Sequence, residues 1–145
     1  MQSLKGQGKF LNSTKASLIT SFETPLKSIR VNESFRRNCV LTNIGAMFGR
    51  TLINNVDFLS EVDYMNLQYE PAFVYVECPN LKNVNIPANV TKLGAYTFAG
   101  CENIESINLT NNIHYIGDYS FVGCTSLTAI TMPDEIEYLG GGILN

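Results

Sequence analysis

Three cysteines, Cys78, Cys101 and Cys124, are equally spaced, and the sequence around them repeats with the same period. Gly94 and Gly117 also recur at this period. The apolar positions are Leu81, Val84, Ile86, Val90, Leu93 and Phe98 after the first cysteine, Ile104, Ile107, Leu109, Ile113, Ile116 and Phe121 after the second, and Leu127, Ile130, Met132, Ile136 and Leu139 after the third. Because a unit this short cannot bury its own apolar side, neighbouring copies must stack and share one core. The chain is therefore predicted to be a solenoid.

Each unit reads as a short strand followed by a turn and a return limb. The Ile-x-Ile step has the period of two of a strand whose alternate side chains point into a core. Pro87 and Pro133 follow this step, where the missing N–H ends strand pairing. The second apolar run has a spacing of three and ends at Gly94, Gly117 or Gly140. We expect these glycines to permit backbone angles that a side chain would resist.

The repeat is predicted to begin upstream of Cys78. Ile53, Val56 and Phe58 show the strand pattern, with Val62 and Met65 at the onward spacings. A still earlier copy is formed by Leu26, Ile29, Val31 and Phe35. Both units are longer than the period set by the cysteines, so each carries a short insertion, which the surface loops of a solenoid tolerate. Five strands are predicted, at residues 26–31, 53–58, 81–86, 104–109 and 127–132.

Residues 86–101, Ile-Pro-Ala-Asn-Val-Thr-Lys-Leu-Gly-Ala-Tyr-Thr-Phe-Ala-Gly-Cys, resemble the BspA-type leucine-rich repeat, and residues 113–133 repeat this pattern. The resemblance is clear over residues 78–145 and degenerate over 26–77. It implies a leucine-rich-repeat solenoid of about five rungs, with a short parallel β-sheet on one face and turns and irregular or short return limbs on the other. It implies no reaction, because the family has no catalytic residues to transfer. It suggests a surface presented to another macromolecule, as in bacterial and protozoan surface adhesins and some phage-encoded proteins.

The chain of 145 residues fits one domain. Residues 1–22 lack the repeat and are predicted to form an N-terminal cap or docking arm, with a short helix starting at Asn12, and residues 23–145 form the solenoid. No apolar run is long enough to span a membrane, and no secretory leader is visible. The expected location is the virion or the cytoplasm if the chain is complete, and the cell surface if it is a fragment of an exported protein.

Charge is divided along the chain. Residues 1–50 contain eight Lys or Arg and two acids (net +6), whereas residues 51–145 contain two Lys or Arg and eleven acids (net −9). This predicts a basic end that docks on an acidic partner, including the acidic end of another copy. The alternative is a solvated basic cap without a partner. The residues of the basic end are Lys5, Lys9, Lys15, Arg30, Arg36 and Arg37.

The last unit ends without its Gly-Cys, because Leu144 stands one period after Phe121. Solenoids need their ends covered. No polar capping helix is predicted after residue 132. We therefore expect a partner, another domain or another copy to cover this end.

No residue set predicts a catalytic, cofactor or metal site. The cysteine column has parallel side-chain vectors, which disfavours disulfides, and no Cys-x-x-Cys pair accompanies the lone His114, so the thiols are expected to be free and buried. The state of Cys39 stays open. No nucleophile has a base beside it, and the glycines lack the context of a phosphate-binding loop. Asp134, Glu135 and Glu137 lack the alternating ligands of a calcium loop and form a solvated acidic turn.

The outward positions of the predicted strands form the candidate contact surface. They carry small polar side chains, and Tyr115 and Tyr138 recur one period apart, as expected for contact residues because tyrosine is enriched in interfaces. The alternative is an ordinary solvated sheet face. The strand residues of this surface are Asn55, Asp57, Asn83, Asn85, Ser106, Asn108 and Thr131.

The sequence thus predicts a non-enzymatic protein interaction or structural module within a larger assembly. The alternatives are a phage virion component (a fibre, decoration or tail protein), a bacterial surface adhesin fragment, and, from another class, a small-ligand-binding protein or enzyme. The expected partners are other proteins; no cofactor or membrane span is predicted, and nucleic acid is not expected as a partner.

Overall fold

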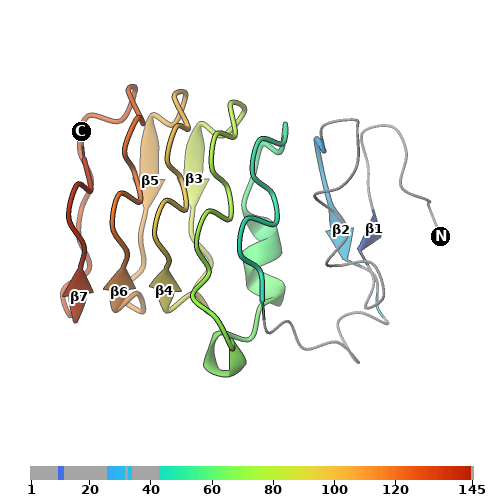
Figure 1. The fold of residues 1–145 in the computed structure, drawn as a ribbon, viewed down its shortest axis with the longest axis horizontal. Coiled ribbons are helices and arrows are strands. Elements are labelled where there is room, and N and C mark those ends of the chain that lie inside the picture. The colour runs from blue at the N-terminus through green and yellow to red at the C-terminus, as the bar shows by residue number, and fades with distance from the viewer. Residues whose placement is uncertain (1–9, 12–25, 32, 34–42, 145) are drawn as a thin grey trace.

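The structure is a computed structural model and describes residues 10–11, 26–31, 33 and 43–144. Successive coils of the chain stack along the long axis of the molecule (Figure 1). The stack runs from the 3-10 helices η2 (Asp57–Glu61) and η3 (Tyr64–Asn66) to the strand β7 (Tyr138–Leu139). The fold is therefore a repeat solenoid built from very short regular elements.

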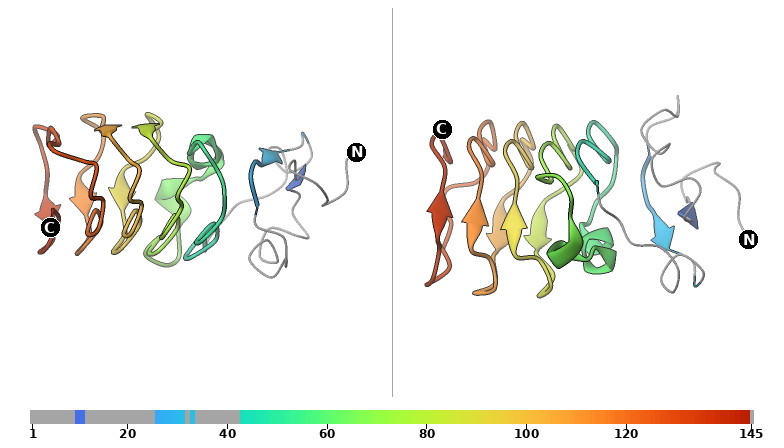
Figure 2. Two further views of the ribbon diagram at one scale, coloured as in Figure 1. Left: turned by 90° about the horizontal axis from the view of Figure 1, so that it is seen from above. Right: turned by 60° about the horizontal axis from the view of Figure 1, so that its bottom comes forward.

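Two parallel sheets connect the coils, and they lie on different sides of the coil (Figure 2). Strand β3 (Asn83–Asn85) pairs with β5 (Ser106–Asn108), so that residue 83 faces residue 106. Strand β4 (Lys92–Leu93) pairs with β6 (Tyr115–Ile116), which pairs with β7 in the same way. Every partner in both sheets lies one repeat period further along the chain. Strands of neighbouring coils therefore pair with the same offset in sequence that separates the cysteines. The return limb forms strands and is thus more regular than predicted.

The upstream part of the chain also contains parallel pairing. Strand β1 (Phe10–Leu11) pairs with β2 (Arg30–Val31) in parallel. Leu26 is buried, and its carbonyl accepts a hydrogen bond from the N–H of Leu52 at 2.5 Å. The helix predicted from Asn12, the residue Phe35 and the thiol of Cys39 lie outside the described residues.

The strand predicted at residues 53–58 does not form. Ile53, Val56 and Phe58 are buried as predicted, but the backbone is irregular and enters η2 at Asp57. The equivalence of Met65 with the core residue Leu93 is wrong as well, because Met65 lies in η3 and is 93% exposed. The insertion in this unit replaces strand geometry by two 3-10 turns, which direct Met65 to solvent.

The strand predicted at residues 127–132 is also absent. Leu127 is buried, but Ile130 and Met132 are only partly buried. The apolar pattern of the repeat continues in this unit, but the backbone pairing of the β3–β5 sheet ends at β5.

A further backbone ladder runs through the corner that follows each return limb, at residues 44–51, 71–78, 94–101 and 117–124. Alternate residues donate to the next coil, as Tyr75 N does to Thr97 O at 2.9 Å. The residues between them close turns within their own coil, as Val76 N does with Phe73 O at 3.3 Å. This alternation places Phe73, like its equivalents in the neighbouring coils, at a φ near +60°. A positive φ is unfavourable for a residue with a large side chain, so the inter-coil hydrogen bonds must hold these residues in this conformation.

The corner glycines serve a different purpose from the one predicted for them. Gly94, Gly117 and Gly140 do not have a positive φ; a Cβ at Gly94 would instead lie 2.5 Å from the backbone of Pro71. A Cβ at Gly117 would lie 2.5 Å from the N of Ala95. The glycine is therefore required because the preceding coil passes too close for any side chain, and the prediction of unusual backbone angles at these positions is wrong.

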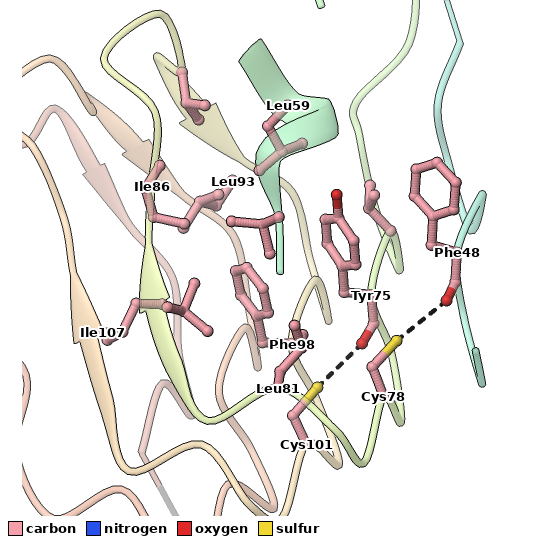
Figure 3. Packing of buried hydrophobic residues seen from close by; sticks show 14 of the residues in the cluster. Phe48, Leu59, Tyr75, Cys78, Leu81, Ile86, Leu93, Phe98, Cys101 and Ile107 are labelled. Atoms are coloured by element: carbon pink, nitrogen blue, oxygen red, sulfur yellow. Dashed lines mark hydrogen bonds between the residues drawn. The ribbon is translucent and has the colours of Figure 1, made fainter. Parts of the chain in front are cut away.

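The core contains a column of stacked aromatic rings from successive coils, and Figure 3 shows Phe48, Tyr75 and Phe98 of this column. Phe48, Tyr75, Phe98 and Phe121 are all buried. Their successive ring centroids are 5.5, 5.7 and 5.6 Å apart, and the ring planes of the last two pairs are nearly parallel. Offset stacking of this kind is favourable beyond the burial of apolar area. The column fixes how far one coil sits from the next.

Candidate interaction surfaces

The cysteine column belongs to the core and not to a site. Cys78, Cys101 and Cys124 are buried free thiols, as predicted. Burial raises the pKa of all three thiols, that of Cys124 to about 11. Each Sγ donates to a carbonyl oxygen of the preceding coil at 3.1 Å, from Cys78 to Phe48, from Cys101 to Tyr75 and from Cys124 to Phe98. Figure 3 shows the first two of these hydrogen bonds. The thiols therefore link neighbouring coils. Within the described part of the chain, no group of three or more His, Cys, Asp or Glu residues is placed to hold a metal ion.

The β3–β5 sheet carries an outward ladder of polar side chains. Ser106 Oγ donates to Asn83 Oδ1 at 2.8 Å, and Asn108 Nδ2 donates to Asn85 Oδ1 at 2.5 Å. The three asparagines are exposed and Ser106 is half-buried. We call these four residues the polar ladder. Each side chain is fixed by the equivalent side chain of the next coil.

Three residues of the predicted contact surface that were assigned to strands lie outside this ladder. Asn55 and Asp57 are exposed, but the Oδ1 of Asn55 accepts the backbone N–H of Asp57 at 3.0 Å and so forms the turn that precedes η2. Thr131 is exposed in a segment without a strand. The structure therefore brings together only the central part of the predicted strip.

Tyr115 and Tyr138 belong to the other sheet, β4–β6–β7. Their rings stack with centroids 4.7 Å apart, and Lys92 Nζ lies 5.6 Å from the centre of the Tyr115 ring. The hydroxyl of Tyr138 donates to Asp118 Oδ1 at 3.1 Å, and this hydrogen bond raises the pKa of Tyr138. Lys92 Nζ is also 3.5 Å from Glu70 Oε1. These contacts hold the tyrosine pair, our second candidate surface, in one orientation.

The predicted basic end is described only at Arg30, which is exposed on β2. Lys5, Lys9, Lys15, Arg36 and Arg37 lie outside the described residues. Arg50, which was not among the predicted docking residues, pairs with Glu77 at 2.7 Å across two coils. Both side chains of this pair are exposed, so the pair is expected to contribute little to stability.

The sequence interpretation missed a groove at the corner of the coils. Its volume is about 590 Å³, and its lining includes Phe73, Tyr96, Gly100 and the Arg50–Glu77 pair. The rings of Phe73 and Tyr96 stack at 4.8 Å, and the Tyr119 ring follows at 5.2 Å from Tyr96. The recurrence of an aromatic residue at positions 73, 96 and 119 was the signal that could have revealed this exposed stack.

A second, smaller hollow of about 370 Å³ lies beside the η2–η3 insertion. Asn89 and His114 are in its lining. Asn89 Nδ2 donates to the carbonyl oxygens of Leu59 and Val62, both at 2.9 Å, and so ties the insertion to the next coil. His114 is half-buried, and its Nδ1 lies 3.1 Å from the carbonyl oxygen of Glu135. His114 therefore contacts the backbone of the last coil, which is a structural role.

The last coil exposes apolar side chains whose equivalents are buried one coil earlier. Leu139 is 47% exposed, whereas its strand partner Ile116 is fully buried. Leu144 is 45% exposed, and Phe121, one period before it, is 1% exposed. We call Tyr138, Leu139 and Leu144 the terminal surface. It is the face that the next coil of a repeat would cover.

Comparison with known proteins supports the repeat assignment. The sequence model of a family described as "BspA type Leucine rich repeat region (6 copies)" matches residues 68–145, which is more than half of the chain. No curated protein and no solved structure matches the chain. In the portion that the structure describes, no helix has the length and apolar character needed to cross a membrane.

Proposed function

The chain belongs to the BspA-type leucine-rich-repeat family, and from this membership we propose that it is a non-enzymatic interaction or structural module. It consists of five coils and presents its repeat surface to another protein within a larger assembly. The polar ladder and the tyrosine pair are the proposed contact surfaces.

The observation that carries this proposal is the fixing of exposed side chains by their neighbours. In the polar ladder, Ser106 and Asn108 hold Asn83 and Asn85 through side-chain hydrogen bonds. Exposed side chains normally lose rotamer freedom when a partner binds, at about 0.5–1.5 kcal/mol each. A ladder that is already ordered avoids much of this cost. The coils thus offer a rigid surface without an induced change.

The tyrosine pair adds contact area of a kind that interfaces favour. Tyr138 is 43% exposed, and its ring is held by the Tyr115 ring and by Asp118. Tyrosine supplies apolar area with few rotatable bonds and a polar tip, which explains its enrichment in interfaces. The two surfaces lie on different sheets, so the module can contact two partners or two parts of one partner.

The proposed partners are other proteins, and a second copy of the chain is one of them because of the divided charge. The setting is a phage virion, where the chain acts as a fibre, decoration or tail protein, or a bacterial cell surface, where it is part of an adhesin. Gene neighbourhood separates these settings, since capsid and tail genes beside the coding sequence support the virion, whereas sortase or secretion genes support the adhesin.

Site-directed photo-crosslinking tests the contact surfaces. A photoreactive amino acid is placed at Asn85 in the polar ladder and, in a separate variant, at Met65, which is exposed on η3 outside both surfaces. Both variants are exposed to extract of the source cells. We expect one protein to crosslink at position 85 and not at 65, and to be lost when Asn108 is replaced by Arg.

Equal crosslinking at both positions, or insensitivity to Asn108→Arg, would contradict the polar ladder as a contact surface. The same design with the label at Tyr138 and the variant Tyr115→Arg tests the tyrosine pair. Circular dichroism of each variant serves as the control for folding.

A further inference from the structure

We propose that the corner groove binds a proline-rich segment of another protein, in the polyproline II conformation and with a basic residue beside the prolines. This inference rests on the proposed interaction function and adds a third surface, for which it names the chemistry of the partner. The lining of the groove comes from the corner segments of four successive coils, residues 44–51, 71–78, 94–101 and 117–124. Its aromatic wall, its backbone and the charge around it carry the inference.

The aromatic wall of the groove leaves one ring face uncovered. The rings of Phe73, Tyr96 and Tyr119 stack in that order, so that each covers a face of its neighbour. In the coil before Phe73 the equivalent position holds Ala46, which also lines the groove and is too small to cover the other face of Phe73. Phe73 is accordingly 42% exposed. Proline rings dock against exposed aromatic residues of this kind, and one seated over Ala46 would extend the stack.

Small side chains keep the groove open beside this wall. Val76, Ala99 and Val122 occupy equivalent positions in successive coils and carry no polar side-chain group. Gly100 stands one coil after Glu77 at the same position, so no side chain closes the groove there. The volume of about 590 Å³ is therefore available to an apolar chain segment.

The backbone N–H groups of the groove are already used. Every described lining residue except Gly123 donates its N–H to a carbonyl oxygen of the corner, as Phe73 N does to Ala95 O at 2.9 Å and Tyr96 N does to Asp118 O at 3.0 Å. An added β-strand depends on main-chain hydrogen bonds and finds no row of donors here. A polyproline II segment binds without such a row, because its affinity comes from side chains packed in an aromatic groove.

The hydroxyl groups of Tyr96 and Tyr119 supply the donors that such a segment can use. Neither hydroxyl has a hydrogen-bond partner in the part of the chain that the structure describes. A polyproline II segment has no internal hydrogen bonds, so its carbonyl oxygens are free to accept. The tyrosines therefore offer polar contacts along the same wall that offers apolar ones.

The spacing of the rings matches the repeat of the proposed ligand. The centroids of Phe73 and Tyr96 are 4.8 Å apart, and those of Tyr96 and Tyr119 are 5.2 Å apart. One turn of polyproline II contains three residues and rises about 9 Å, which is close to two of these steps. Residues i and i+3 of the segment thus meet equivalent positions two coils apart, and the favoured pattern is Pro-x-x-Pro.

Charge favours a basic residue beside the prolines. Among the described lining residues the charged ones are Arg50 and Glu77, and they pair at 2.7 Å. Residues 51–145 contain eleven acids and two Lys or Arg. Of these acids, Glu102 and Asp118 are exposed in or next to the corner segments. An apolar groove in a surface of net negative charge attracts a ligand with a basic flank.

Fluorescence anisotropy with the full chain tests the proposal, at protein concentrations up to about 1 mM to cover weak affinity. The probe is a labelled Pro-x-x-Pro peptide with one terminal arginine, of about ten residues or roughly three turns. We expect saturable binding, and binding at least about tenfold weaker for a peptide with alanine in place of each proline. Replacing the arginine by glutamate should also weaken binding, and salt should reduce this difference.

Substitutions in the aromatic wall should lower the affinity for the proline peptide. Phe73→Ala should weaken binding by at least about tenfold, because it removes the ring against which a proline packs. Tyr96→Phe should weaken it about two- to tenfold through loss of the hydroxyl donor. The matched control is Tyr69→Ala, which removes a ring that is 60% exposed outside the groove and should leave the affinity unchanged. Circular dichroism checks the folding of each variant.

Methyl NMR of the unmodified chain locates the site without any substitution. The proline peptide should shift the methyl signals of Val76, Ala99 and Val122, which belong to the groove. The methyl signals of Val84 and Val90, which are buried in the core, should stay unchanged.

Absence of binding at about 1 mM overturns the proposal. Equal binding of the alanine peptide, an unchanged affinity in Phe73→Ala, or methyl shifts confined to residues outside the groove overturns it as well. Shifts of the groove methyl signals by cellohexaose and not by the proline peptide would assign the groove to a glycan and reject a peptide ligand.

Crosslinking at position 85 reports on a different surface, so the two proposals can fail separately. A crosslink there without peptide binding would keep the interaction function and reject the groove as a proline site. Peptide binding without that crosslink would reject the polar ladder and keep the groove.

Discussion

The hydroxyl group of Tyr75 offers a sharp test of how the aromatic column is packed. Tyr75 is fully buried between the rings of Phe48 and Phe98, and its hydroxyl has no hydrogen-bond partner within the described chain. The other members of the column are phenylalanines. Burial raises the pKa of Tyr75 well above its ordinary value, with smaller contributions from Tyr64, Cys78 and Asp57, so the group stays neutral. Replacing Tyr75 by Phe should therefore stabilise the protein.

The magnitude follows from two opposing terms. A buried hydroxyl without a partner costs about 1–3 kcal/mol in lost hydration, and Tyr75→Phe removes this cost. The vacated space is on the order of 10 Å³, which at about 24 cal/mol per Å³ costs about 0.2 kcal/mol. The net gain in the free energy of unfolding is thus about 0.8–2.8 kcal/mol. The melting temperature should rise by about 2–4 °C for each kcal/mol in a chain near this size.

Urea unfolding followed by circular dichroism measures this gain, with the slope of the transition checked for constancy. The matched variant is Phe98→Tyr, which adds a hydroxyl to the next ring of the same column and should destabilise the protein by about 1–3 kcal/mol. A loss of stability in Tyr75→Phe would refute the reasoning, because it would show that the hydroxyl makes a hydrogen bond. A neutral Phe98→Tyr would show that the column can accommodate such a group.

Further substitutions and a change of pH test the core. Phe98→Ala should lower the free energy of unfolding by about 3–5 kcal/mol because the ring is fully buried, and a near-neutral result in urea unfolding would show that the column contributes little. Gly117→Ala should cost at least about 1–3 kcal/mol, since its Cβ would meet the backbone of the preceding coil. Gly141→Ala, with nothing within 4 Å, should stay within about 0.5 kcal/mol, and equal thermal shifts for the two glycine variants would reject the close-approach argument. Stability should also fall as the pH rises from 9 to about 11, because burial raises the pKa of the Cys124 thiol from 9.0 to about 11 in the folded state, and its contribution is complete only below the unfolded value. In Cys124→Ser this decline should be smaller, and an unchanged pH profile would exclude the thiol as its cause.

The period of the repeat could be predicted from the sequence because it is a property of side chains that face the same way in every coil. Cys78, Cys101 and Cys124 stand in one column, and the strands pair at the same period. The apolar pattern also located the buried residues Ile53 and Val56 upstream, where no strand forms. Side-chain burial can thus be predicted from the local apolar pattern of the sequence.

It was harder to predict from the sequence where the backbone forms a regular strand, because strand pairing involves the neighbouring coil as well as the segment itself. Residues 127–132 have the strand pattern of residues 104–109, yet only the earlier segment forms a strand. The need for Gly94 and Gly117 arises from the distance between coils, which no local sequence specifies. Met65 shows the same limit, because the insertion before it alters the direction of the chain.

For the candidate surfaces too, the positions of the residues could be predicted from the sequence and their contacts could not. The polar ladder residues Asn83 and Asn85 were predictable as outward positions of a strand, and so was the pairing of Tyr115 with Tyr138 at one period. Their hydrogen bonds and ring contacts could not be predicted, since they require the distance between coils. The corner groove was missed because its lining combines Arg50 and Glu77 with glycines one coil later, and it exists only after stacking.

Each interior coil is covered on two sides, so its apolar positions are constrained by the core and reveal little about partners. The outward positions of β3 and β5 lie outside this constraint, and there the polar ladder residues are held by one another through side-chain hydrogen bonds. Stacking of the coils thus orders an exposed surface without fixing which residue types it carries. This outward surface is therefore the part of the repeat that can be adapted to a partner while the core stays the same.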